Sequence, residues 1–393
     1  MKQKRIPIYP LVALFIFSFV IRIIFLLIII PGEPVSDPSR YIRRAELILE
    51  KGTYADSTGS ITAYEPPFTA VFISPIVATG NRRLIGVYNA LFNSISIILA
   101  YLLFIRGNAG KKQAIYSAIV LSVMPSWLFY NGFVNAEIPF VLFGLSSLLL
   151  LDIDGRFWRS LLSGIFTGIA ILTKGLGIFI LPLGFFLLWR EGMEIKRIFK
   201  IGIIAFCGAL LVISPWIARN LTKMDFAGIS TNTGPNLYIG NSEIANGSWV
   251  PYTETLPPET QEIERSRFYS KKALEWVASN PGKFLTLLPK KFFWLWTPEY
   301  EWVIWHNPSN IDFAWKIAIA GQVLWWTILL ISIFSIVKRR VIDKDPIFDL
   351  SIITVFGISA FYLIFFGAGR FHYPVCWAIA YLAVYPNKEL QAD

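Results

Sequence analysis

IPIYPLVALFIFSFVIRIIFLLIII, residues 6–30, is followed directly by PGEPVSDPSRY, residues 31–41. A helix needs about 20 apolar residues to cross a bilayer, and the first stretch is longer than that. It is also too long for a signal peptide and has no small-residue cleavage site. We therefore expect an uncleaved membrane-spanning helix with its amino end in the cytoplasm, followed by a polar, acidic segment on the opposite side of the membrane.

The composition extends this expectation to the whole chain. Of 393 residues, 55% are hydrophobic and only 16% are charged, with 32 Phe and 14 Trp. These values predict an all-α polytopic membrane protein that forms one integral domain over residues 1–393. The net charge of +10 comes without a nucleic-acid motif, so we expect membrane lipids and no nucleic acid as partners. Cys207 and Cys376 lie in apolar runs and predict neither a disulfide framework nor a thiolate metal site.

Nine further apolar runs give about ten transmembrane helices in all. They cover residues 84–105, 113–130, 137–151, 160–173, 175–189, 201–218, 312–337, 347–367 and 374–385. Basic clusters then fall on one side, which we predict to be cytoplasmic. They comprise Arg106, Lys111, Lys112, Arg156, Arg159, Arg190, Lys196, Arg197, Lys200, Lys338, Arg339, Arg340 and Lys344. The sequence thus predicts a multi-pass protein of the plasma (inner) membrane with both termini in the cytoplasm.

Two long extracytoplasmic loops, 31–83 and 219–311, identify the outer face as the working face. In the first loop, Tyr41, Ala45, Ile48 and Leu49 predict one face of an amphipathic helix on the membrane. Residues 66–78 are too few to span and are expected to be interfacial or re-entrant. In the second loop, the turn formers of 231–241 predict an ordered polar loop, followed by a charged helix at 258–279 and an aromatic, basic segment at 289–305.

The order of several motifs along the chain carries a family resemblance. They are Asp37 with Tyr41, PP at 66–67, AEIPF at 136–140, LTKG at 172–175, PWIARN at 215–220, NLYIGN at 236–241 and GRFHYP at 369–374. In this order the chain resembles the membrane glycosyltransferases of the GT-C superfamily, in the group of protein O-mannosyltransferases and lipid A aminoarabinose transferases. One departure is that Pro38 stands where those families often have a second acidic residue.

The resemblance implies a GT-C fold whose active site faces the extracytoplasmic side. It also implies a polyprenyl-phosphate-linked sugar as donor, and it leaves a glycan, a lipid or a protein open as the acceptor. Among the motif residues, Tyr41 and Arg219 are expected to contact substrate on this ground alone.

Asp37 has two interpretations that do not depend on the family. An Asp followed by Pro38 is a common start of a helix, where the carboxylate accepts from free backbone amides. Alternatively, Asp37 is a general base that takes the proton of an acceptor hydroxyl as that oxygen attacks the anomeric carbon. The place of Asp37 after the first span favours the catalytic role, and both roles are compatible.

Two basic residues and a histidine are candidates for binding the donor phosphate. Lys174 lies between two apolar runs, where it either snorkels to the surface or stabilises the charge of a leaving phosphate. Arg370 lies at another outer turn, and its planar guanidinium suits phosphate binding. His372 is less specific, because a lone His is more often a structural hydrogen-bonding group.

Other polar residues remain open between a substrate contact and a structural role. Glu65 and Glu137 either orient a sugar or cap a helix. Asn236, Tyr238 and Asn241 either hydrogen-bond a sugar or form a turn scaffold.

The hypothesis that follows is an inverting glycosyltransferase that uses a lipid-linked donor. Lys174 and Arg370 hold the donor phosphate and Asp37 activates the acceptor hydroxyl. The sequence demands no cofactor, leaves a metal requirement open, and contains no Gly-rich phosphate loop for a nucleotide. The alternative from another class is a transporter or flippase of a lipid-linked or anionic solute, for which Arg22 inside the first span is the main sign.

Overall fold

The computed structural model describes residues 8–107, 110–151, 154, 156–251, 256–257, 260–338 and 345–384. Within these ranges the chain is helical and has no strand beyond one isolated bridge. The helices are α1 (Ile8–Ile28), α2 (Ser36–Lys51), α3 (Phe68–Val77), α4 (Leu84–Arg106), α5 (Lys111–Val123), α6 (Pro125–Phe129), η1 (Tyr130–Gly132), α7 (Glu137–Leu150), α8 (Phe157–Thr173), η2 (Gly175–Phe179), α9 (Ile180–Arg190), α10 (Ile195–Met224), α11 (Thr233–Gly240), α12 (Glu262–Ser279), α13 (Pro281–Trp296), α14 (Glu301–His306), α15 (Ile311–Lys338), α16 (Pro346–Ile364), η3 (Gly369–Val375) and α17 (Cys376–Val384). The predicted all-α architecture is confirmed.

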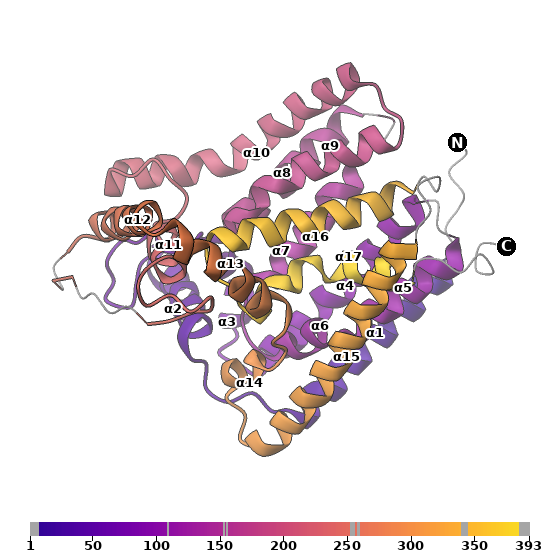
Figure 1. Ribbon diagram of the computed structural model, residues 1–393, viewed down its shortest axis with the longest axis horizontal. Coiled ribbons are helices and arrows are strands. Elements are labelled where there is room, and N and C mark those ends of the chain that lie inside the picture. The colour runs from indigo at the N-terminus through magenta and orange to yellow at the C-terminus, as the bar shows by residue number, and fades with distance from the viewer. Residues whose placement is uncertain are drawn as a thin grey trace.

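Five helices are long and apolar enough to cross a membrane, namely α1, α4, α10, α15 and α16. A sixth span results if α5 and the following α6–η1 pair, which meet at a bend of 56°, are one broken helix. The chain is therefore a multi-pass membrane protein. Figure 1 labels these helices in the ribbon. Shorter apolar helices coincide with several of the other predicted runs. The predicted basic residues Arg339, Arg340 and Lys344, and residue 385 of the last run, lie outside the described residues.

Close helix packing relies on small residues. A Cβ on Gly164 of α8 would lie 1.8 Å from the backbone oxygen of Ala205 in α10. A Cβ on Gly208 of α10 would lie 2.4 Å from the oxygen of Leu161. Small residues allow such approach between helices in lipid, where packing replaces the hydrophobic driving force. The pair α8–α10 is thus held backbone to backbone.

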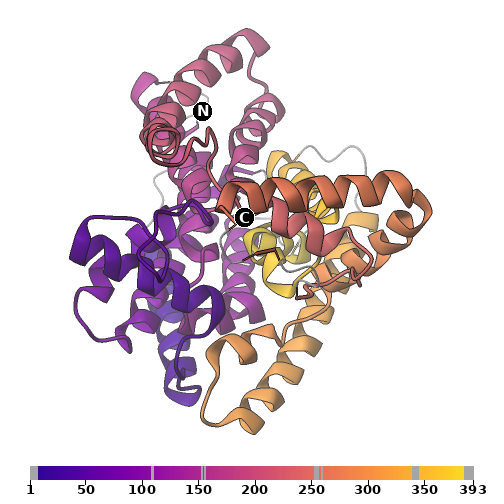
Figure 2. The same cartoon turned by 90° about the vertical axis from the view of Figure 1, so that its left-hand side faces the viewer.

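The helices of the two long loops gather at one end of the bundle. Helices α2, α11 and α12 lie at the left in Figure 1, the side that faces the viewer in Figure 2. Glu262 at the start of α12 joins the loops, since its carboxylate accepts from Thr62 Oγ1 at 2.6 Å, the backbone nitrogen of Ala63 at 3.0 Å and Thr231 Oγ1 at 2.6 Å. We call this end, with both loops, the loop-bearing end.

One local prediction for the loops is wrong. Residues 233–240 form helix α11, not a polar loop. Gly234 and Pro235 occupy its first turn, where a missing amide or side chain costs little, and Tyr238 packs on Tyr269 of α12 with ring centroids 5.0 Å apart. The helix predicted around Tyr41 and Ala45 is present as α2, in which Tyr41 and Ala45 are buried and Leu49 is exposed.

Candidate active site

Asp37 occupies the first turn of α2 but does not cap it. The helix follows Val35, which makes no side-chain cap, and Ser36 adopts a left-handed φ of 54°. The Asp37 carboxylate instead meets two arginines: Oδ2 accepts from Arg370 Nη1 at 2.7 Å, and Oδ1 accepts from Arg40 Nη2. The capping interpretation is therefore wrong, and the carboxylate points toward cations.

The pKa of Asp37 is set by these partners. Burial alone raises the pKa of this carboxyl, but the guanidinium groups of Arg370 and Arg40 outweigh burial and hold it below its usual value. Asp37 is consequently ionised at neutral pH, which a proton acceptor requires.

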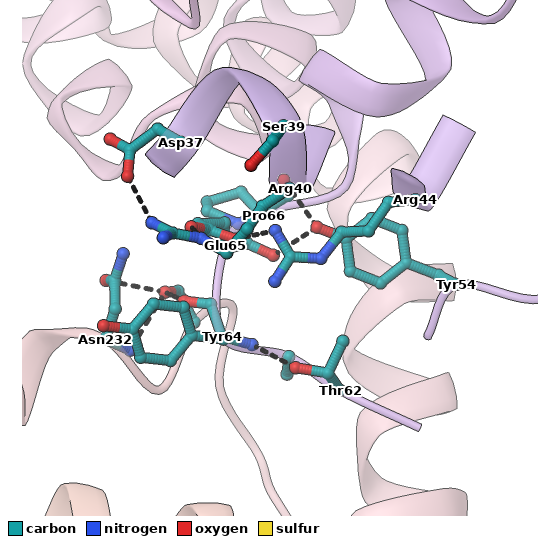
Figure 3. A network of polar contacts seen from close by, with 12 residues as sticks. Asp37, Ser39, Arg40, Arg44, Tyr54, Thr62, Tyr64, Glu65, Pro66 and Asn232 are labelled. Carbon is teal, nitrogen blue, oxygen red and sulfur yellow. Dashed lines mark hydrogen bonds and ion pairs between the residues drawn. The ribbon is translucent and has the colours of Figure 1, made fainter. Parts of the chain in front are cut away.

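Behind Asp37, the arginines of α2 converge on Glu65 (Figure 3). Arg40 Nε donates to Glu65 Oε1 at 2.9 Å, and Arg44 forms an ion pair with the other carboxylate oxygen. Tyr54 donates its hydroxyl hydrogen to the backbone oxygen of Glu65 at 2.9 Å. Side chains of Glu65 and Arg44 are 5% and 4% exposed, so this pair is an internal support and Arg40 links it to Asp37.

Arg370 reaches Asp37 from η3, at the far end of the sequence. Its backbone nitrogen donates to Glu301 Oε2 at 3.4 Å, and its guanidinium lies 4.8 Å from the ring centroid of Trp305. Burial lowers the pKa of Arg370, but Asp37 and Glu137 outweigh this effect and raise it. The guanidinium therefore remains a permanent cation beside the Asp37 carboxylate.

A second ion pair lies next to η3. Lys174 Nζ donates to Glu137 Oε1 at 2.7 Å, and Glu137 is almost completely buried. The Lys174 ammonium also lies 5.0 Å from the ring centroid of Phe371, the residue after Arg370. Lys174 is thus paired inside the protein and does not simply extend to the surface. The structure brings Asp37, Glu137, Lys174 and Arg370 to one region.

His372 and Tyr41 are both buried beside this region. The His372 ring lies within hydrogen-bonding distance of Leu295 O and Glu299 Oε1, both at 2.7 Å, and of Ser126 Oγ at 2.8 Å. It also stacks on Trp325 at 4.2 Å. Both ring nitrogens of His372 thus have protein partners. Burial raises the pKa of Tyr41, and the charges of Asp37 and Glu137 raise it further.

Three of the four remaining predicted contacts, Arg219, Tyr238 and Asn241, have structural partners. Arg219 donates to the backbone oxygens of Thr62 at 2.8 Å and Tyr54 at 2.7 Å, and so holds the first loop. Tyr238 packs on α12. Asn241 is buried among backbone carbonyls and Lys291, whereas Asn236 is half-buried on α11.

Sequence reasoning missed several polar residues of this region. Arg40 and Arg44 were not among the predicted site residues, and their spacing of four on α2 is the signal that both face Glu65. Glu301, whose pKa is raised by burial, and Lys291 carried no signal, because nothing local in the sequence predicts burial of a charged residue. Among the described residues, no group of three or more His, Cys, Asp or Glu side chains could hold a metal ion.

An acid flanked by two arginines, next to a lysine–glutamate pair, is an arrangement suited to an anionic ligand and a proton-donating partner. The fold containing it is similar to that of two solved oligosaccharyltransferase structures. An archaeal oligosaccharyltransferase, AglB from Archaeoglobus fulgidus, in complex with an inhibitory peptide and a dolichol-phosphate, aligns with a TM-score of 0.52 at 17% identity over 96% of this chain and 49% of that chain. An A. fulgidus oligosaccharyltransferase structure with Zn and sulfate gives a TM-score of 0.50 at 16% identity, over 95% and 48%.

The sequence comparisons agree with this fold. Residues 65–218 match the family model of dolichyl-phosphate-mannose-protein mannosyltransferases. An uncharacterised protein of Aquifex aeolicus (strain VF5) is 26% identical over 211 residues, which cover 50% of this chain and 40% of that protein. The chain thus spans less than half of these relatives' own length. The predicted resemblance to GT-C membrane glycosyltransferases is confirmed.

Proposed function

We propose that this protein transfers a sugar, with inversion, from a polyprenyl-phosphate donor to an acceptor hydroxyl on the extracytoplasmic face. The observation that carries the proposal is the contact between Asp37 and Arg370, two residues 333 positions apart whose side chains meet at 2.7 Å. A base for the acceptor and a cation for the phosphate are thereby adjacent, as a displacement at the anomeric carbon requires.

In this reaction, the acceptor oxygen attacks the anomeric carbon, the bond from that carbon to the phosphate oxygen breaks, and Asp37 takes the hydroxyl proton. Arg370 and Lys174 stabilise the charge on the departing polyprenyl phosphate. Both cations already face carboxylates, so the donor phosphate replaces a carboxylate as the partner of Arg370. Binding the donor therefore releases one oxygen of Asp37 for the acceptor.

The other predicted site residues lie around Asp37, Arg370 and Lys174. Glu65 and Glu137 hold Arg40 and Lys174 in place, and Tyr41 lies beside the acid. His372 lies two residues after Arg370 on η3, and its ring nitrogens bind protein atoms, so it supports this short helix. An apolar pocket between α7, η2 and α16 includes Leu176, two residues after Lys174, and Pro374 of η3. Its apolar lining next to Lys174 supports the proposal that it takes part of the donor's isoprenoid chain.

The topology we propose has ten spans in one domain over residues 1–393, with both termini cytoplasmic. The five long helices and the bent α5–α6 pair are joined by α7, α8, η2–α9 and η3–α17. Labelling with an impermeant thiol reagent tests the sidedness. Single cysteines at exposed Glu50 and exposed Lys196, in a Cys207→Ser background, should react from opposite sides of the membrane.

Mass spectrometry of the purified protein in nanodiscs tests the activity. The protein is incubated with a panel of polyprenyl-phosphate sugars, and released polyprenyl phosphate is measured. Wild type should release it from one donor class, and Asp37→Asn should lose turnover by about 100-fold or more while still binding the donor. Glu50→Gln, an exposed acid on the same helix, is the matched control.

Unchanged turnover in Asp37→Asn would remove the general-base assignment. Absence of release with every donor, together with scrambling of intact lipid-linked sugar in liposomes, would favour the transporter. Arg22, the main sign for the transporter, is buried, and its Nη1 donates to Ser18 Oγ at 2.7 Å and to the backbone oxygen of Ser18 at 2.9 Å. Both bonds come from Nη1, and among the described residues the buried Nε and Nη2 of Arg22 have no hydrogen-bond partner.

A further inference from the structure

The end of α16 is closed by two side chains from the second loop, 219–311. Lys291 of α13 is fully buried, and its ammonium donates to the backbone oxygen of Leu363 at 3.0 Å and to Asn241 Oδ1 at 2.8 Å. The Asn241 amide in turn donates to the backbone oxygen of Ile364 at 2.8 Å. The last carbonyls of a helix have no partner within it, and a cation is favourable at that end. Lys291 and Asn241 thus cap α16.

The backbone that follows this cap is enclosed by the same loop. A Cβ on Gly240 of α11 would lie 1.8 Å from the oxygen of Phe365, and one on Gly367 would lie 2.1 Å from the oxygen of Lys291. Gly367 also donates its backbone N–H to the oxygen of Gly247 at 2.9 Å. The segment from α16 to η3 therefore runs in direct backbone contact with α11 and α13, which restricts its path.

Arg370 lies directly after this enclosed segment in the sequence. A Cβ on Gly369 would lie 2.0 Å from the oxygen of Pro298, and the next residue is held by Glu301 and Trp305. Every one of these contacts comes from the second loop. The position of the Arg370 guanidinium relative to Asp37 is thus fixed by residues that do not themselves touch Asp37.

We propose that Lys291 and Asn241 are positioning residues, which act through the cap of α16 and the glycine-lined segment to hold Arg370 where the donor phosphate binds. This inference rests on the function proposed above for Arg370. It gives Asn241 a role within the protein in place of contact with a sugar. Because burial lowers the pKa of Lys291 to about 8, the ammonium depends on these carbonyl partners for its solvation.

The test compares Lys291→Met with Lys290→Met in nanodiscs. Lys290 is the exposed neighbour on the same helix, so both variants lose the same charge. Hydrogen exchange followed by mass spectrometry should show faster exchange over residues 365–370 in Lys291→Met only. Undecaprenyl phosphate should bind about tenfold more weakly to Lys291→Met and unchanged to Lys290→Met, as expected when a buried charged hydrogen bond is removed.

Turnover separates positioning from general support. In Lys291→Met, the KM for the donor should rise while kcat at saturating donor is retained, and Lys291→Arg, which keeps the charge, should restore part of the affinity. A lower kcat with an unchanged donor KM would overturn the proposal. If Lys291→Met does not fold, Lys291→Gln, which retains a donor group, replaces it in the same comparison.

The outcomes for the two proposals are distinct. Failure of wild type to bind undecaprenyl phosphate would count against the proposed function. Exchange over 365–370 that is equal in Lys291→Met and Lys290→Met would overturn the positioning role, whether or not wild type binds the lipid.

Discussion

The two ends of the helix bundle use charged residues in different ways. At the end where α4 stops, Arg106 Nε and Nη2 donate to the two oxygens of Glu191, each at 2.8 Å. At the loop-bearing end, Asp37 divides its oxygens between Arg370 and Arg40, and Arg40 is itself divided between two acids. One arrangement is a closed bidentate pair, and the other is a chain of shared partners.

Exposure does not explain the difference. The side chains of Arg106 and Glu191 are 18% and 11% exposed, and those of Arg370 and Asp37 are 23% and 18% exposed. The number of hydrogen bonds in each ion pair explains it. The bidentate pair must lose two parallel hydrogen bonds to open, whereas Arg370 makes one to Asp37. A closed pair suits a joint between helices, and a shared carboxylate suits exchange of one partner for a ligand.

The largest expected effect comes from removing the internal support of the shared chain. Glu65→Ala leaves the buried guanidinium of Arg44 without its carboxylate, and the free energy of unfolding should fall by about 3–5 kcal/mol. Chemical denaturation in detergent measures it. Glu50→Ala, on the exposed side of α2, should change the free energy of unfolding little. An equal loss of this free energy in both variants would show that the ion pair of Glu65 does not stabilise the fold.

The all-helical, membrane-spanning architecture could be predicted from the hydrophobic runs alone, because a bilayer imposes a minimum length on each apolar helix. The runs at 84–105 and 312–337 correspond within a residue to α4 and α15. Helix α11 could not be predicted, since its Gly and Pro are turn formers and only its packing on α12 makes it helical.

The candidate site was predictable residue by residue but not as a set of contacts. A polar segment after a span was enough to single out Asp37, and an outer turn was enough to single out Arg370. Their contact spans 333 residues, and no local pattern encodes it. The capping role of Asn241 was equally hidden, because it depends on where α16 ends in space.

A second prediction tests whether the shared pair is the exchangeable one. Arg370→Ala should weaken binding of a polyprenyl-phosphate donor by about 100-fold, since a charge-assisted bond to phosphate is lost. Arg370→Lys should retain part of the affinity, because it keeps the charge but not the planar guanidinium. Isothermal titration in nanodiscs gives both values. Equal affinity in wild type and Arg370→Ala would mean that the phosphate binds elsewhere.

The closed pair should respond in the opposite way. Arg106→Met should lower the free energy of unfolding by about 1–2 kcal/mol, because the partly buried Glu191 loses its bidentate partner. Donor affinity and kcat should stay at the wild-type values. A change in donor affinity would show that the two ends are coupled, and the contrast between them would then be wrong.

The smallest effect concerns pH and follows from the two guanidinium groups at Asp37. Burial raises the pKa of Asp37, but Arg370 and then Arg40 lower it below the usual value of about 3.9. The ionised carboxylate is therefore favoured in the fold: its contribution to stability is present above the unfolded pKa and is lost as pH falls through the lower folded pKa. The acidic limb of kcat/KM, which reports the free enzyme, should accordingly lie below about pH 4 in wild type.

Arg40→Gln removes one of the two cations and keeps Arg370 for the donor. The acidic limb of kcat/KM should then move to higher pH, because burial is opposed by a single guanidinium. Arg43→Gln is the matched control on α2, since Arg43 pairs with Glu46 at 3.1 Å and not with Asp37. An acidic limb that moves equally in both variants would assign the shift to the net charge of the loop. A limb that moves in Arg40→Gln alone would identify Asp37 as the titrating base and its shared arginines as the groups that keep it ionised.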